Sequence, residues 1–171
     1  GMHVEDVSYR PSTRPSLHPG KTAEVLIGDR VVGVIGELHP LVKANYEFEA
    51  APVYVAEFDL AKILASSRIL FDVEAIPTYP PVLEDLAVVV DEEVAAAEVE
   101  TVLWKGGGDY LAKVKLFDIY RGKQIGEGKK SLAYSLTYQS PDRTMTDQEV
   151  AQIRGRIIKR LEQELGAKLR S

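Results

Sequence analysis

The chain has 171 residues, of which 45% are hydrophobic and 27% charged, a composition typical of one or two soluble globular domains. It contains no cysteine, which excludes disulfides, thiolate metal sites and cysteine nucleophiles and fits a reducing, cytoplasmic location. No apolar run approaches the roughly 20 residues that span a bilayer, and Gly1 ahead of Met2 is typical of a chain cut by a protease, so we expect a fragment.

The formal net charge of −5 is distributed unevenly along the chain. Residues 1–77 carry a net charge of −4 and residues 78–110 carry −7, whereas residues 111–171 carry +6. A basic segment joined to an acidic one either offers a surface to phosphates or balances the charge of its neighbour within one fold. The charges alone favour the second interpretation.

Residues 1–77 predict a first unit of strands and short helices. Gly28-Asp29-Arg30 is a hairpin signal between two β-rich runs, and Gly33 and Gly36 indicate a bulge or the close approach of another backbone. The first 20 residues, which include three prolines, are expected to be extended and to lack a pairing partner. The expected elements are strands at 22–27, 31–38 and 53–58 and helices at 40–48 and 59–65.

Pro80 and Pro81 open a second unit at residue 78, because two prolines resist a helix and fix an extended entry. Thr146 and Glu149 form a capping box ahead of a long amphipathic helix that Gly166 ends. The expected elements are strands at 86–90, 114–120, 131–139 and 167–170 and helices at 94–105 and 147–165. This β-α-β-β-α-β order predicts an α+β, ferredoxin-like domain with both helices on one face of its sheet and the other face free.

The hairpin between the two middle strands, GKQIGEGKK at residues 122–130, is rich in glycine and lysine. It lacks the first glycine and the hydroxyl residue of a P-loop and does not open a helix, so a P-loop is excluded. Two interpretations remain: a flexible, solvated hairpin, or a contact with an RNA backbone. Tyr134 and Tyr138 alternate with polar residues and are expected in the core rather than as base-stacking platforms.

No catalytic, cofactor-binding or metal-binding constellation is predicted. His18 and His39 each precede a proline, and turn histidines are far commoner than a two-histidine and carboxylate metal site. Asp85, Asp91 and Glu92 are better explained as solvated carboxylates than as an acid–base pair. The sequence has no Ser-His-Asp order, no HExxH motif and no GxGxxG motif.

Two stretches of the second unit, YPPVLEDLAVVVDEEV (79–94) and LFDIYRGKQIGEGKKSLAYSLTYQSPDRTMTDQEV (116–150), resemble a known family. They are similar to the ferredoxin-fold anticodon-binding domain that closes the β subunit of bacterial phenylalanyl-tRNA synthetases. Residues 17–40 and 53–64 resemble the end of the class-II-synthetase-like core module of that subunit. The resemblance implies a catalytically silent core-module portion at residues 1–77 and an anticodon-binding domain at residues 78–171.

The resemblance implies a non-catalytic, tRNA-binding part of a cytoplasmic phenylalanine–tRNA ligase. Its partners would be tRNA(Phe) and the α subunit of an α2β2 enzyme, with no membrane contact, and ATP and magnesium would act in the full enzyme only. An alternative is a protein-interaction module whose open sheet docks a protein partner. An independent small enzyme is the third and weakest interpretation.

The family motif maps onto residues 120–134 and 140–144 of this chain. Glu84 departs from the family pattern, which has a basic residue before the aspartate of its RDLA motif, so a phosphate contact by the first strand is in doubt. We therefore expect the tRNA contacts in and beyond the hairpin, at Arg121, Lys123, Lys129, Lys130 and Arg143.

Overall fold

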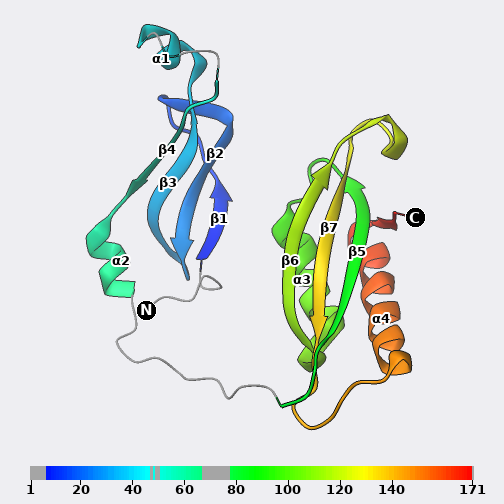
Figure 1. The fold of residues 1–171 in the computed structure, drawn as a ribbon. Helices are drawn as coiled ribbons and strands as arrows, with labels where there is room; N and C mark the ends of the chain where they lie inside the picture. Colours follow the sequence, from blue (N-terminus) through cyan, green and yellow to red (C-terminus); the bar gives the residue numbers. More distant parts are fainter. Residues whose placement is uncertain (1–6, 47, 49–50, 67–77, 171) are drawn as a thin grey trace. The chain divides into compact units, whose positions relative to one another are not determined.

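The computed structural model describes residues 7–46, 48, 51–66 and 78–170. The chain divides into two compact units, which we call unit 1 (Gly1–Glu74) and unit 2 (Ala75–Ser171) (Figure 1). In the described residues, no helix is both long enough and apolar enough to cross a membrane.

The described residues of unit 1 form an antiparallel, four-stranded sheet in the order β1-β2-β3-β4 and two short helices. Gly33 has no room for a side chain, because a Cβ there would lie 2.3 Å from the ring of Phe58 on the neighbouring strand; this confirms the close approach that the sequence predicted. The elements are β1 (Val7–Pro11), β2 (Leu17–Ile27), β3 (Arg30–Leu38), α1 (Pro40–Asn45), β4 (Tyr54–Phe58) and α2 (Leu60–Ser66).

The expectation of an unpaired N-terminal segment is wrong for the residues that the structure describes. β1 pairs in antiparallel register with the second half of β2, from Val7 opposite Ile27 to Pro11 opposite Ala23. The proline does not prevent this pairing, because β1 is an edge strand and Pro11 is its last residue. Residues 1–6 lie outside the described residues.

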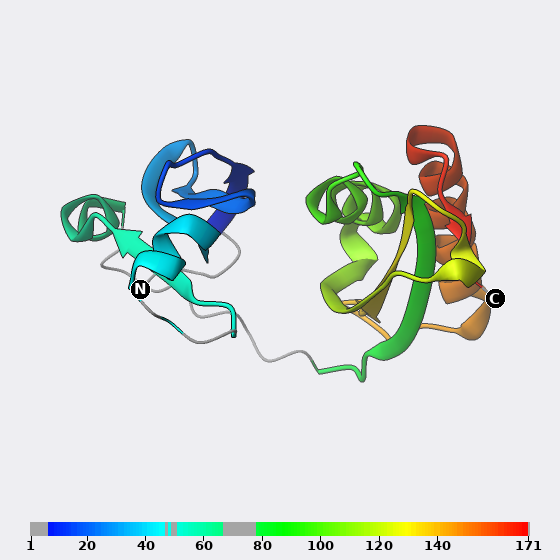
Figure 2. The ribbon, with the colours of Figure 1, turned by 90° about the horizontal axis from the view of Figure 1, so that it is seen from above.

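Unit 2 has the predicted β-α-β-β-α-β order, and its strands form an antiparallel sheet in the order β6-β7-β5-β8. Both helices lie on the same side of this sheet (Figure 2). The α+β class is therefore confirmed. The elements are β5 (Val82–Asp91), α3 (Ala96–Gly107), β6 (Leu111–Tyr120), β7 (Lys129–Tyr138), α4 (Asp147–Leu165) and β8 (Lys168–Leu169).

The core of unit 2 lies between the sheet and the two helices. Tyr134 and Tyr138 belong to it, as predicted, and the Tyr134 hydroxyl donates a hydrogen bond to the backbone oxygen of Ala96, 3.1 Å away. Strand β7 supplies a completely buried row, because every second side chain points toward the helices. That row consists of Leu132, Tyr134, Leu136 and Tyr138.

The glycine triplet after α3 does not stop the helix where the sequence predicted. Gly106 and Gly107 are the last residues of α3, and both are buried. A Cβ on Gly106 would lie 2.9 Å from the Cα of Ile157 in α4. The backbone of α3 at Gly106 therefore packs directly against Ile157 of α4. This tertiary packing outweighs the low helix propensity of glycine.

Gly106→Ala should lower the free energy of unfolding of unit 2 by about 1–3 kcal/mol, because the added methyl group forces α3 away from α4. Gly155→Ala is the matched control: it adds the same methyl group to a position of α4 with no atom within 4 Å, and should stabilise the unit by about 0.5–1 kcal/mol. Urea unfolding followed by the fluorescence of Trp104, the chain's one tryptophan, measures both. Equal effects of the two substitutions would contradict the close helix crossing.

Candidate nucleic-acid interface

Three of the five predicted tRNA contacts are held by the acidic end of β5. The Arg121 guanidinium binds the Glu92 carboxylate through two nitrogens, at 3.0 Å from Nε and 2.7 Å from Nη2, and this contact holds the pKa of Glu92 below its usual range. Lys130 donates from Nζ to the backbone oxygen of Glu92 at 2.6 Å. Lys129 Nζ lies 2.5 Å from Asp91 Oδ1. These cations therefore close the hairpin against β5.

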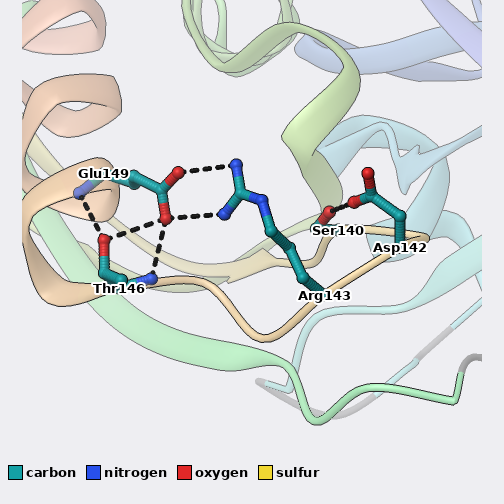
Figure 3. A network of polar contacts seen from close by, with 5 residues as sticks. All are labelled: Ser140, Asp142, Arg143, Thr146 and Glu149. Atoms are coloured by element: carbon teal, nitrogen blue, oxygen red, sulfur yellow. Dashed lines mark hydrogen bonds and ion pairs between the residues drawn. The ribbon is translucent and has the colours of Figure 1, made fainter.

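The fourth predicted contact, Arg143, is part of the N-terminal cap of α4 (Figure 3). Its guanidinium lies 2.6 Å and 2.8 Å from the two carboxylate oxygens of Glu149. That carboxylate also accepts hydrogen bonds from the backbone nitrogen and the hydroxyl of Thr146, both at 2.9 Å. The hydrogen bonds from Arg143 and then Thr146 lower the pKa of Glu149 to about 2. Arg143 thus completes the predicted capping box.

Lys123, the fifth predicted contact, lies in a short 3-10 turn (Lys123–Ile125) at the tip of the hairpin and is exposed. Among the described residues it is the one predicted cation whose side chain has no hydrogen bond or ion pair; its backbone oxygen accepts from the Gly126 amide. The structure therefore brings the five residues to two different places, and four of them already have carboxylate or carbonyl partners.

The face of the unit 2 sheet that points away from the helices carries its own set of cations. Strand register places Lys113 opposite Thr137 and Lys115 opposite Ser135 on this open face, and Lys168 of β8 lies opposite Val89. The carboxylates of Asp85 and Asp118 share the face, as their register with Ser135 and Ala133 shows. With Arg170, these are four cations against two carboxylates, and the ion pair of Lys129 with Asp91 at the end of the same face adds no net charge, so the open face is net positive.

The Tyr120 ring lies at one end of this open face. Tyr120 is opposite Ser131 in the register of β6 and β7, and the Arg170 guanidinium lies over the Tyr120 ring at 4.5 Å from its centroid. Ser131 is 1% exposed, and its hydroxyl has no hydrogen-bond partner among the described residues. A π-system, a cation and an unsatisfied hydroxyl are therefore held together at one end of the sheet.

Sequence reasoning missed Tyr120 because a bulge changes the alternation of β6. Lys113 and Lys115 face the open side, and a register shift between Leu116 and Asp118 then leaves Phe117 unpaired. After the shift, Asp118 and Tyr120 take the open side instead of the core side that strict alternation would assign. Phe117 is 54% exposed, but this exposure is a property of the folded strand, and the sequence itself carries no signal for the bulge.

Glu84 lies on the opposite side of the sheet, toward the helices. It is in register with the buried Leu136, and one of its carboxylate oxygens lies 3.3 Å from Nε of Arg154 in α4. The departure from the family pattern at this position therefore concerns the contact between β5 and α4. It leaves the charge of the open face unchanged.

The comparisons with known proteins agree with the resemblance found in the sequence. Residues 77–170 match the model of the ferredoxin-fold anticodon binding domain, and residues 1–60 match the phenylalanyl tRNA synthetase beta chain CLM domain. The chain is 45% identical over 170 residues to the phenylalanine–tRNA ligase beta subunit of Clostridium acetobutylicum, covering 99% of this chain and 21% of the relative. Identity to the corresponding subunit of Geobacillus kaustophilus is 41% over 164 residues, covering 96% and 20%. The chain thus spans about a fifth of the length of these relatives.

The contact between Glu84 and Arg154 predicts a charge-swap rescue. Glu84→Arg sets two cations against each other beneath the sheet and should lower the free energy of unfolding of unit 2 by about 1–3 kcal/mol. The double variant Glu84→Arg/Arg154→Glu should recover most of that loss. Arg160→Glu disrupts an exposed ion pair on the same helix and serves as a control, with an expected change below about 1 kcal/mol. If the effects of the two substitutions on the free energy of unfolding simply added in the double variant, the contact between Glu84 and Arg154 would be contradicted.

The low pKa of Glu149 predicts how unit 2 responds to acid. Because the folded-state pKa is about 2 and the ordinary value is 4.5, the Arg143–Glu149 contact should stabilise the fold fully above pH 4.5 and progressively less as the pH falls toward 2. Arg143→Gln should therefore destabilise unit 2 most at neutral pH, and the difference from the parent should shrink in acid. Urea unfolding at a series of pH values measures this difference, and a difference that grows in acid would contradict it.

Proposed function

Because the chain belongs to the ferredoxin-fold anticodon-binding domain family, we propose that unit 2 binds the anticodon region of a transfer RNA on the open face of its sheet. In this proposal the chain is the non-catalytic, tRNA-binding part of a phenylalanine–tRNA ligase β subunit. The observation that carries it is the Tyr120 ring on a net-positive face, beside Arg170 and the unpaired Ser131 hydroxyl.

The chemistry of this face suits unpaired RNA. Bases in a loop stack on aromatic rings and guanidinium planes, and their edges and ribose hydroxyls form hydrogen bonds with protein hydroxyls. Tyr120 and Arg170 provide the two kinds of plane, and Ser131 provides a hydroxyl that lacks a partner within the described residues. Lys113, Lys115 and Lys168 are placed to contact phosphates around them.

The proposal gives the hairpin cations a secondary role. Arg121, Lys129 and Lys130 would reach RNA phosphates only in competition with Asp91 and Glu92, and Arg143 would have to leave the cap of α4. Lys123 has no such competitor. We therefore propose Lys123 as a peripheral contact and the open face as the main one.

For the whole enzyme, we propose the activity in the relatives' name, phenylalanine–tRNA ligase, and take its further parts from the resemblance found in the sequence. Phenylalanine would be joined to tRNA(Phe) with ATP and magnesium on the α subunit of a cytoplasmic α2β2 assembly, outside this chain. The boundary between the core-module portion and the tRNA-binding domain is proposed at residues 77 and 78. The role of the chain in that reaction is to bind and orient the tRNA.

Binding to a tRNA(Phe) anticodon stem-loop, measured by fluorescence anisotropy across a salt series, tests the proposal. With about four phosphate contacts, the log–log slope of affinity against salt should be about −3. Tyr120→Ala should weaken binding by about tenfold or more, because a stacked base loses its platform. Lys113→Glu, Lys115→Glu and Lys168→Glu should each flatten the slope by about one contact.

Lys129→Glu and Lys130→Glu are the matched charge controls on the hairpin and should change the slope less than the open-face variants. A flat salt dependence of the parent would overturn the proposal. So would a Tyr120→Ala variant that binds like the parent while the hairpin variants lose affinity, because the RNA would then lie on the hairpin.

A further inference from the structure

A groove runs along α4 on the helix layer of unit 2, away from the open face of the sheet. It has a volume of about 570 Å³, and its apolar lining consists of the 37%-exposed ring of Tyr110 and the outer edges of Met145 and Ile153, which are 7% and 4% exposed. The rim carries Gln152, Arg156 and Lys159 from successive turns of α4. An apolar floor beside a polar rim is the form in which an amphipathic helix is bound.

The rim of the groove has uncompensated positive charge. Arg154 and Arg160, on the same helix, pair with Glu84 and Glu164. Arg156 and Lys159 have no ion pair among the described residues. The one carboxylate that lines the groove, Glu149, is held by Arg143. Acidic groups on a partner would therefore meet two free cations and no free anion.

Gly155 lies in the middle of this surface. It is exposed inside a 19-residue helix, where glycine is less favourable than alanine, and a Cβ there would meet nothing within 4 Å. The same unit shows the packing that a helical glycine permits, since Gly106 lets α4 approach α3. Gly155 offers that close approach to a helix from outside the unit.

We propose that this groove binds an acidic amphipathic helix of a protein partner, which crosses α4 at Gly155. The partner's apolar stripe lies mainly on the Tyr110 ring, at the edges of Met145 and Ile153, and its carboxylates pair with Arg156 and Lys159. This inference is independent of the proposed RNA site, because none of these residues is on the open face of the sheet.

A synthetic helical peptide with a leucine and alanine stripe flanked by glutamates is a direct probe, with a matched peptide that carries lysines in place of the glutamates. Titration into the full chain, followed by NMR chemical shifts, should move the amide signals of Gln152, Gly155 and Arg156 with the acidic peptide only. Arg156→Glu/Lys159→Glu should weaken binding by about tenfold. Gly155→Leu should abolish binding while unit 2 remains folded, as Trp104 fluorescence reports.

Lys168→Glu, on the open face, is the control and should leave peptide binding unchanged. Equal binding of the two peptides, or binding that survives Gly155→Leu, would overturn the inference. The inference would also be overturned if the anticodon stem-loop competed with the acidic peptide and Arg156→Glu/Lys159→Glu removed that competition. The groove would then be a nucleic-acid surface. The groove variants change residues of α4, whereas the open-face variants change residues of the sheet. Loss of peptide binding can therefore be distinguished from loss of RNA binding.

Discussion

The arrangement of unit 2 depends on the burial of alternate side chains of its central strand β7. Leu132, Tyr134, Leu136 and Tyr138 are each 0% exposed against the helices, and a buried side chain of this kind contributes about 1.5–3 kcal/mol. Because neighbours on a strand point to opposite faces, the burial of this row also determines which residues form the open face. A slip of one residue would exchange the two faces. The proposed binding surface is therefore a consequence of the core.

Charge pairing within unit 2 decides which cations are available to a ligand. The acidic segment at residues 78–110 supplies Asp91 and Glu92, which hold the hairpin cations. It also supplies Glu84, which holds Arg154. Much of the positive charge of residues 111–171 is thus balanced inside the fold, as the sequence suggested. The cations that remain on the open face and on α4 are the ones that a partner can use.

The regular parts of unit 2 could be predicted from the sequence, because long alternating and helical patterns, a capping box and a terminal glycine each have one structural interpretation. The bulge at Phe117 could not, because its position depends on how β6 pairs with β7, and without it Tyr120 is assigned to the core. Gly106 was likewise read as a helix stop, because its contact with Ile157 is tertiary. The pairing of β1 was not predicted because prolines, of which the first 20 residues contain three, argue against a strand, although an edge strand tolerates them.

The glycine- and lysine-rich hairpin and the Tyr120 end of the open face are structurally coupled. A Cβ on Gly122 would lie 2.3 Å from the Tyr120 hydroxyl, so this glycine makes room for the ring that ends β6. Arg121 binds Glu92, and the Glu92 amide donates to the Gly128 carbonyl oxygen at 2.9 Å, so both ends of the hairpin are anchored to β5. Substitutions in the hairpin that weaken RNA binding would therefore act by displacing Tyr120 as well as by removing charge, and the salt slope separates the two, since only lost charge reduces it.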